Sequence, residues 1–277
     1  MTVTQAINIK AVCERDALVE AMALITGVVA GRTPTPALQC VRISGQDGRL
    51  TLAATDGEVS LTLTIDRVDL ENSGEVLVPA DKFSQIARSC DDTTLTVVGD
   101  GDMLNVRSSD SRFKVFGFPI SEAPEILTFE EFEQDFSIDS ATFRGLMERT
   151  VFAAATDHSR YAINGVHLDL NGSQIRLVAT NGHRLALSMG PCDNSCEKAD
   201  CIVPTKAMTL LKRLLHDDGG TVSVKIDNGR IIFRVDNGAG CTSTLTSNLV
   251  EGTFPPFEDV IPKDLDRKAV VNKEALH

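Results

Sequence analysis

The sequence contains no tryptophan and a single tyrosine among its 277 residues. Proteins that bind single-stranded nucleic acid stack the bases on aromatic side chains, so the chain lacks the platform of that class. No apolar run reaches about 18 residues, the length that a membrane-spanning helix needs. The N-terminus M-T-V-T-Q-A-I-N-I-K also lacks the profile of a signal peptide. These absences predict a cytoplasmic protein without a membrane partner.

Basic side chains are fewer than acidic ones. The chain has 27 Lys and Arg against 39 Asp and Glu, which gives a formal net charge of −12. A protein that coats nucleic acid needs a basic face to neutralise the phosphates, so the overall charge argues against that class. The charge still permits a protein whose basic residues are gathered on one inner surface.

Motifs for catalysis are also absent. There is no P-loop, no nucleophile elbow and no H-E-x-x-H spacing. The one combination that could be imagined as a triad has no motif around it and consists of His183, Asp157 and Ser188. Histidine and aspartate residues without a motif are usually structural, so the sequence predicts that the protein is not an enzyme.

The cysteines do not form a recognisable framework. Seven are present, an odd number, and most lie inside strand or helix patterns, which favours reduced thiols. Three of them cluster in P-C-D-N-S-C-E-K-A-D-C: Cys192, Cys196 and Cys201. Their spacing is not that of a zinc site, and no fourth ligand is close in the sequence. We therefore expect neither a metal nor a cofactor.

The chain does contain an internal repeat. Residues 49–61, R-L-T-L-A-A-T-D-G-E-V-S-L, match residues 175–187, I-R-L-V-A-T-N-G-H-R-L-A-L, which places Thr55 opposite Thr180 at an offset of 125 residues. Residues 78–88, V-P-A-D-K-F-S-Q-I-A-R, match residues 203–213, V-P-T-K-A-M-T-L-L-K-R, at the same offset. A constant offset indicates two copies of one domain, and such copies form arrays or rings more often than a single catalytic pocket.

A third copy begins near the end of the chain. Residues 267–276, R-K-A-V-V-N-K-E-A-L, resemble the start of the first copy, I-N-I-K-A-V-C-E-R-D-A-L, and of the second, F-S-I-D-S-A-T-F-R-G-L. The sequence thus predicts one domain over 1–127, a second over 128–265 and the beginning of a third over 266–277. We expect the chain to be a fragment of a longer protein that lacks most of this third domain.

Hydrophobic periodicity predicts an α+β fold. The alternation in T-L-T-V-V and L-T-L-T-I is typical of half-buried antiparallel strands. Each copy reads as two β-α-β-β-β units, with helices predicted over 14–29, 80–90, 140–155 and 205–217. Apolar residues at helical spacing form one stripe on the helices and leave their basic residues on the opposite face. The pattern alone leaves open whether that face binds a ligand or only contacts water.

Two segments resemble a known family. R-Y-A-I-N-G-V-H-L-D-L at 160–170 and V-A-T-N-G-H-R-L-A at 178–186 closely resemble the β subunits of bacterial DNA polymerase III, the replicative sliding clamps. G-R-T-P-T-P-A-L, S-R-F-K-V and E-G-T-F-P-P-F-E-D-V-I-P, which begin at positions 31, 111 and 251, support the likeness. The resemblance implies repeated clamp domains, and two subunits that close head to tail into a ring around duplex DNA. Antiparallel sheets would lie outside, and two helices of each domain would face the DNA.

The resemblance also implies where DNA is bound. The positions that match DNA contacts of the family are Arg32, Arg160 and Tyr161, to which we add the basic helix residues Lys82, Arg88, Lys206 and Arg213. Three departures from the family pattern affect this surface: Asp81, Asp157 and Ala162. Sliding along DNA needs weak phosphate contacts rather than base recognition, so it tolerates such redistribution of charge.

A peptide-binding cleft is implied on domain two. It would receive a short linear motif carried by the DNA polymerase III alpha subunit, the clamp loader and other clamp-binding proteins. The matching residues are Ile163, Thr180, Gly182, His183, Arg184, Leu185, Pro255 and Val260. T-N-G-H-R-L taken alone also predicts a hairpin turn, and the two interpretations are compatible. Asp259 replaces a basic residue of the family beside the cleft.

Ring closure is implied at the edge of domain one, where Phe113 and Val115 match the apolar residues of the family's subunit interface. The full-length protein is thus expected to be a homodimer, and the fragment to be monomeric or weakly associating. A peptide-binding scaffold without topological DNA binding is the alternative function.

Overall fold

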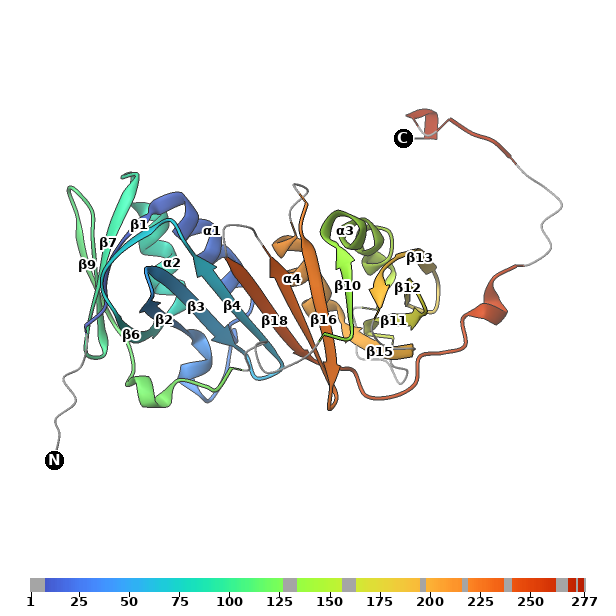
Figure 1. Ribbon diagram of the computed structural model, residues 1–277, viewed down its shortest axis with the longest axis horizontal. Coiled ribbons are helices and arrows are strands. Elements are labelled where there is room, and N and C mark those ends of the chain that lie inside the picture. Colours follow the sequence, from blue (N-terminus) through green and yellow to red (C-terminus); the bar gives the residue numbers. More distant parts are fainter. Residues whose placement is uncertain are drawn as a thin grey trace.

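The computed structural model describes residues 8–126, 134–155, 163–194, 198–215, 219–236, 241–262, 269–272 and 274–276. Two lobes lie side by side along the long axis of the molecule (Figure 1). The expected boundary near residue 127 lies outside the described residues. Within the described part of the chain, no helix is both long and apolar enough to span a bilayer.

The first lobe contains both predicted units of copy one. The first unit consists of β1 (Lys10–Glu14), α1 (Arg15–Ile25), β2 (Cys40–Gln46), β3 (Arg49–Thr55) and β4 (Val59–Ile65). The second consists of β6 (Gly74–Pro79), α2 (Ala80–Ser89), β7 (Thr94–Asp100), β8 (Met103–Arg107) and β9 (Arg112–Phe116). The predicted order is confirmed. An additional strand, β5 (Val68–Asn72), pairs antiparallel with β1, and its mostly polar sequence gave no strand signal.

The second lobe repeats this order. Its first unit consists of β10 (Phe136–Asp139), α3 (Ser140–Glu148), β11 (Gly165–Asn171), β12 (Gln174–Thr180) and β13 (Leu185–Pro191). After the two-residue strand β14 (Asp193–Asn194), the second unit consists of β15 (Lys198–Pro204), α4 (Thr205–Leu214), β16 (Thr221–Asp227), β17 (Arg230–Asp236) and β18 (Thr242–Asn248). The α+β fold with antiparallel sheets is therefore confirmed.

Three helices end earlier than predicted: α1 at Ile25 instead of 29, α4 at Leu214 instead of 217, and α3 by the largest margin. The apolar stripe extends to residue 155, but α3 ends at Glu148 and a 3₁₀ turn follows at Val151–Ala153. Thr150 is fully buried, and its hydroxyl donates to the carbonyl of Leu146 at 2.8 Å. A threonine that bonds to the preceding turn in this way weakens helix continuation, and the chain leaves the α conformation there. The apolar stripe continues into the turn, so periodicity alone could not locate the end.

The four helices form one row. The described contacts join α2 to α1, α1 to α4 and α4 to α3. The predicted apolar faces are buried against the sheets, as shown by Phe83 of α2, Phe143 of α3, and Met208 and Leu211 of α4. The opposite faces form a continuous helical surface that crosses both lobes.

The two lobes share one sheet. A nine-stranded sheet has the order β14-β10-β16-β17-β18-β4-β3-β2-β6, so β18 of the second lobe pairs directly with β4 of the first. This antiparallel pairing, here called the joint, runs from Ser243 opposite Leu63 to Ser247 opposite Val59. Buried residues of both lobes belong to a single hydrophobic core. The lobes are therefore linked by backbone hydrogen bonds and apolar packing as well as by the chain.

The repeat is preserved in atomic detail at two turns. Between β3 and β4, the hydroxyl of Thr55 accepts a hydrogen bond from the amide of Gly57 at 3.0 Å. Between β12 and β13, the hydroxyl of Thr180 accepts one from the amide of Gly182 at 3.1 Å. The two glycines have φ values of 95° and 85°, which are costly for any residue with a Cβ. The T-x-G pattern therefore encodes the same turn in both copies.

We predict that Gly182→Ala lowers the free energy of unfolding by about 1–2 kcal/mol, because alanine is strained at this positive φ. Urea denaturation measures the effect. Gly145→Ala is the matched control: Gly145 lies inside α3, where an added Cβ meets only an Arg149 nitrogen at 3.5 Å. Alanine should be neutral or stabilising there. Equal destabilisation by both substitutions would contradict the assignment of strain to the turn.

Candidate functional sites

The helical surface is basic although the chain is acidic. The four helices hold seven Lys or Arg residues and four Asp or Glu residues, a net charge of +3. The whole chain carries −12, so the remainder carries −15. Predicted DNA-contacting residues on this surface are exposed, namely Lys82 and Arg88 on α2, and Lys206 and Arg213 on α4. The charge therefore favours a polyanion along the helix row over the rest of the chain taken together.

The three other predicted DNA contacts come from loops. Arg32 is exposed between α1 and the 3₁₀ helix Pro36–Gln39. Arg160 and Tyr161 lie outside the described residues, as do the departures Asp157 and Ala162. Asp81 is exposed in the first turn of α2, next to Lys82. Its carboxylate reduces the positive potential at that point of the row.

Lys206 also contacts the other lobe. Its Nζ lies 2.5 Å from Oδ2 of Asp56 in the β3–β4 turn, and 3.1 Å from the carbonyl oxygen of Val28. Burial by itself raises the pKa of the Asp56 carboxyl, but hydrogen bonds from Lys206 and from the amides of Val59 and Glu58 hold that pKa below its ordinary value. The ammonium group of Lys206 is therefore engaged at the joint, and only part of its charge is available to an external ligand.

A basic hollow was not predicted as a site. It measures about 490 Å³ between α1, α3 and α4, and its charged lining residues are Arg144, Lys212, Arg213 and Glu20. Arg213 donates to the carbonyl of Ala23 at 3.0 Å across the lobes. Arg144 and Lys212 share the carboxylate of Glu148 at 3.4 and 3.5 Å. Helical phase put Arg144 and Lys212 on the open face, but only the packing of three helices brings them together.

The β12–β13 turn presents the central residues of the predicted cleft. Gly182, His183 and Arg184 are exposed at its tip. The Arg184 guanidinium donates to the carbonyl of Phe152 at 2.5 Å and lies 5.6 Å from the centre of the Phe152 ring. The ring of Phe152 is 60% exposed. Arg184 is thus held beside an exposed aromatic residue, which the sequence did not single out.

An apolar cluster lies below this turn. Ile163 and Leu185, both predicted cleft residues, pack in it together. Its other members include Val178, Ile202, Phe254 and Phe257. The predicted Pro255 is partly buried between the two phenylalanines, whereas Val260 is 67% exposed farther along the chain. The structure therefore brings most of the predicted cleft residues close together. It adds Phe254 and Phe257 beneath them, which the sequence F-P-P-F could have indicated.

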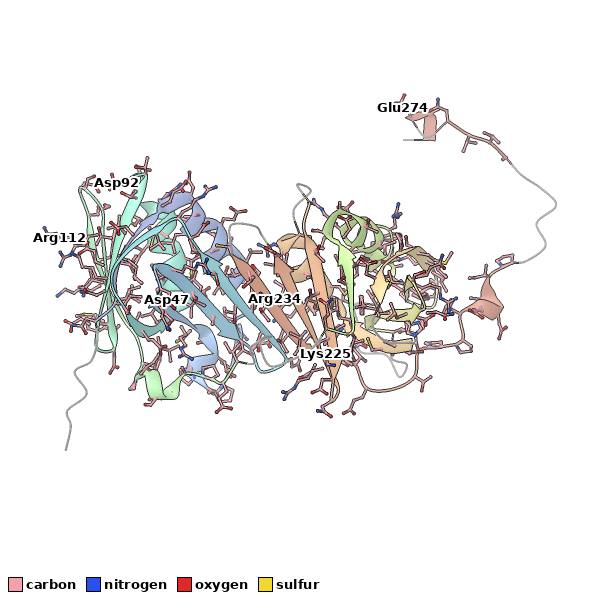
Figure 2. All side chains as sticks on the ribbon, viewed as in Figure 1. Asp47, Asp92, Arg112, Lys225, Arg234 and Glu274 are labelled. Carbon is pink, nitrogen blue, oxygen red and sulfur yellow. The ribbon has the colours of Figure 1, made fainter. Side chains whose placement is uncertain are left out.

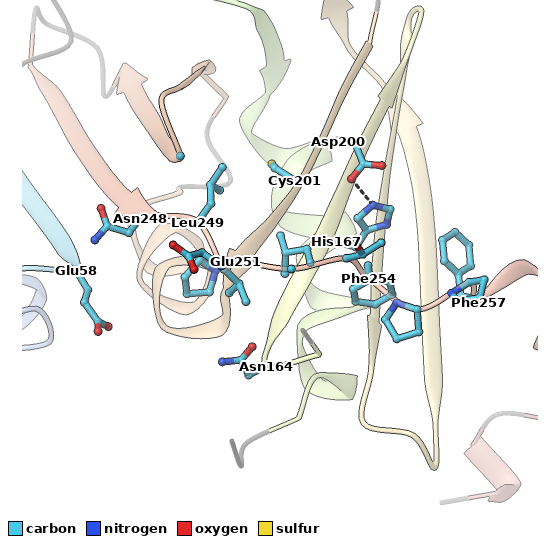
Figure 3. A pocket seen from close by; sticks show the side chains of 18 of the residues that line it. Glu58, Asn164, His167, Asp200, Cys201, Asn248, Leu249, Glu251, Phe254 and Phe257 are labelled. Carbon is cyan, nitrogen blue, oxygen red and sulfur yellow. Dashed lines mark hydrogen bonds and ion pairs between the residues drawn. The ribbon is translucent and has the colours of Figure 1, made fainter. Parts of the chain in front are cut away.

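The two phenylalanines belong to residues 249–257, here called the strap, which crosses the second lobe after β18. The amide of Val250 donates to the carbonyl of Ile202 at 2.9 Å. Phe254 stacks on the ring of His167 with 4.9 Å between centroids and an interplanar angle of 11°. His167 in turn lies 2.9 Å from Asp200 through Nε2 (Figure 3). The strap is therefore anchored at both ends and forms one wall of the cleft.

Each lobe has an edge strand that corresponds in the repeat to a strand of the joint. β9 is the last strand of the five-stranded sheet, and β13 is the last of the four-stranded sheet. Val115, predicted at a subunit interface, is 5% exposed and belongs to the core, and Phe113 packs partly against the core. Phe116 is 76% exposed on the same strand. Figure 2 shows Arg112 of β9 at the end of the molecule farthest from the second lobe.

The imagined catalytic triad is not assembled among the described residues. The Ser188 hydroxyl is 8% exposed and accepts a hydrogen bond from Arg149 at 3.2 Å. His183 lies at the exposed turn, and Asp157 is outside the described residues. Burial raises the pKa of the Cys201 thiol to about 12, so this residue of the cysteine cluster is a poor nucleophile.

Comparison with known families agrees with this arrangement. The family model described as DNA polymerase III beta subunit, N-terminal domain, matches residues 9–127, and the central-domain model matches residues 137–256. The beta sliding clamp of Vibrio cholerae is 33% identical over 267 residues, which cover 95% of this chain and 70% of the relative. That of Pseudomonas putida is 36% identical over 270 residues, covering 95% and 71%.

Solved structures show the same fold. A DNA polymerase sliding clamp from Bacillus subtilis superposes with a TM-score of 0.83 at 26% identity, covering 93% of this chain and 68% of that one. A sliding clamp from Pseudomonas aeruginosa, solved bound to griselimycin, has a TM-score of 0.81 at 33% identity and covers 94% and 69%. Both resemblances extend across the two lobes.

We predict that Lys206→Met lowers the free energy of unfolding at pH 7 by about 1 kcal/mol, because it leaves the largely buried Asp56 carboxylate without its cation. The pKa of Asp56 is lowered in the folded state from 3.8, so this stabilisation is complete above about pH 4 and is lost as the pH falls through the folded value. Denaturation between pH 7 and pH 3 should show the variant and the parent converging in acid.

Lys10→Met is the control for this prediction, since the Lys10–Glu71 pair is about 40% exposed on both sides. Exposed pairs contribute little, so its effect should stay below about 0.5 kcal/mol. A Lys206→Met effect that is as small, or that does not change with pH, would show that the pair across the joint does not stabilise the fold.

Proposed function

The chain belongs to the sliding clamp family, the β subunits of DNA polymerase III, and on that premise we propose that it forms part of a ring that encircles duplex DNA and tethers the replicative polymerase to it. The single observation that carries the proposal is the joint. Pairing of β18 with β4 shows how one clamp domain attaches to the next, through strands that occupy fixed places in the repeat.

The edge strands β9 and β13 can continue this attachment of domains by strand pairing. β13 holds the place in domain two that β4 holds in domain one, and β9 holds the place in domain one that β18 holds in domain two. A third domain can therefore pair its last strand with β13, and the fourth strand of a partner's third domain can pair with β9. This head-to-tail repetition closes into a ring of six domains from two subunits if the rotation at each joint is equal. Phe113, Val115 and the exposed Phe116 then lie at or beside the closing interface.

The basic helix row supports a lining that faces DNA. Its net charge of +3 contrasts with −15 on the rest of the chain, so phosphates are attracted to the row and repelled elsewhere. We assign DNA contacts to Arg32, Lys82, Arg88, Arg160, Tyr161, Lys206 and Arg213, and we add Arg144 and Lys212. Contacts of this kind address the backbone and carry no sequence information, which suits a protein that slides.

The cleft supports the tethering role. Ile163 and Leu185 pack with Phe254 in an apolar cluster, and Gly182, which has no side chain, is exposed in the adjacent turn. A short linear motif with apolar side chains fits such a cleft, while His183, Arg184 and Thr180 offer polar groups at its rim. The partners that we propose for it are the polymerase alpha subunit, the clamp loader and other proteins that carry the motif, in the cytoplasm.

Retention on circular DNA tests the encirclement. The full-length protein is loaded on nicked circular DNA with a clamp loader and ATP, and the fraction that stays bound is measured before and after the circle is linearised. We expect retention on circles and loss from linear ends, because a topological link is released only at an end. Equal retention, or equal loss, on both forms would leave a scaffold that binds peptides without encircling DNA.

Charge substitutions test the inner surface separately. In full-length protein, Lys82→Gln with Arg88→Gln should reduce the slope of log affinity against log salt on linear DNA by roughly 1.8, about 0.9 for each lost phosphate contact. The control, Arg49→Gln with Arg107→Gln, removes two exposed cations from strands instead of helices. Its slope should be unchanged. An equal change in both variants would mean that DNA does not select the helix row.

A further inference from the structure

A second hollow lies beside the strap and shares Ile202, Phe254 and Phe257 with the apolar cluster of the peptide-binding cleft. It measures about 1180 Å³ and extends from the joint at Glu58, past β15, to Phe257 (Figure 3). Its apolar lining includes Ile202, Leu249 and Phe254. Of the predicted cleft residues only Pro255 also lines it. We call this hollow the strap groove.

The charged side chains that line the strap groove are all acidic. They are Glu58, Asp200, Glu251, Glu258 and Asp259, and neither lysine nor arginine is among the described residues that line it. Glu258 pairs with Arg176 at 3.0 Å, and Asp200 contacts His167. Glu58, Glu251 and Asp259 form no ion pair within the described part of the chain.

We propose that the strap groove binds an extended segment of a partner protein in which arginine or lysine alternates with apolar residues. The apolar lining covers the apolar side chains, and the carboxylates pair with the cations, a complementarity that also rejects acidic segments. Nucleic acid does not fit this groove, because its phosphates would face five carboxylates. The volume exceeds the range of about 300–1,000 Å³ typical of small-molecule sites.

The main chain of the strap could also bind a partner segment through its hydrogen-bonding groups. From Glu251 to Pro256 the main chain makes no hydrogen bond to the described residues, although the first two residues of the strap are bonded, Leu249 to the carbonyl of Gly229 and Val250 to that of Ile202 in β15. The amides of Glu251, Gly252, Thr253 and Phe254 therefore have no acceptor among the described residues, and all four residues line the groove. An extended segment can pair with such a wall as an added strand, which supplies affinity independent of sequence.

One buried side chain lacks a partner at the same place. His167 lines the strap groove and is 7% exposed, and its Nδ1 has no hydrogen-bond partner among the described residues. If Nε2 donates to Asp200, Nδ1 is left as an acceptor. A buried acceptor without a donor is unfavourable.

Fluorescence anisotropy with synthetic peptides tests the proposal. The probe is a labelled eight-residue peptide of alternating Arg and Val. Its comparison peptides replace Arg by Glu, or Val by Gly. We expect the Arg–Val peptide to bind and the other two to bind at least about tenfold more weakly, since both charge and apolar contact contribute. Failure of the Arg–Val peptide to bind, or equal binding of the Arg–Gly peptide, overturns the proposal.

Matched variants locate the binding. Glu58→Gln with Glu251→Gln should lower the affinity for the Arg–Val peptide by about tenfold, because two groove carboxylates are lost. Asp47→Asn with Glu125→Gln removes the same charge from exposed positions outside the groove and should leave the affinity within about twofold. Equal weakening in both variants would mean that the peptide responds only to the net charge of the protein.

Two further readouts separate this site from the cleft and from the ring. Hydrogen exchange should show protection of the amides at 251–254 when the Arg–Val peptide is bound, and no protection would overturn the proposal. Displacement of that peptide by a clamp-binding-motif peptide would assign it to the cleft and also overturn the proposal. Retention of the groove variant on circular DNA reports on the ring alone, so the two proposals can fail independently.

Discussion

The pairing of β18 with β4 is the interaction on which the rest of the structure depends. It joins two copies of a domain into one nine-stranded sheet, and it places α4 beside α1, so that four helices form a single basic row. Because backbone hydrogen bonds fix the register from Ser243 to Ser247, the relative orientation of the lobes does not rely on the linker. The same pairing occupies one edge of each copy, while the equivalent strands β9 and β13 remain at the edges of their sheets.

Much of this architecture could be predicted from the sequence, because its signals are local. The offset of 125 residues revealed the repeat, and the T-x-G pattern encodes a turn whose threonine hydroxyl and glycine φ are alike in both copies. Helical periodicity separated the buried Phe143 from the exposed face. The joint could not be predicted in this way, because β4 and β18 are far apart in the sequence and neither strand has a sequence feature that identifies its partner. The early end of α3 depends on one hydroxyl, that of Thr150.

The candidate sites likewise contain residues that the sequence predicted and residues that it did not. Ile163 and Leu185 were predicted by resemblance and lie together, whereas Val260 stands apart from them and Val115 is part of the core. Phe152 and the meeting of Arg144 with Lys212 were missed, because each depends on segments brought together only by packing. The strap explains why one stretch of chain serves two surfaces: its rings belong to the apolar cluster of the cleft and also line the strap groove, where Glu251 adds a carboxylate.

The ion pair between Lys206 and Asp56 has a consequence for how such a chain assembles. A molecule built from copies of one domain must prevent a copy from joining the wrong neighbour. At the repeat-equivalent positions the chain has Asp81 in place of Lys206, and Asn181 in place of Asp56. Between these two copies the pair therefore forms only when domain two attaches to domain one, and attachment of domain one to another domain one would bring two aspartates together. The different charges at equivalent positions of the two domains thus favour the attachment of domain two to domain one over that of domain one to itself.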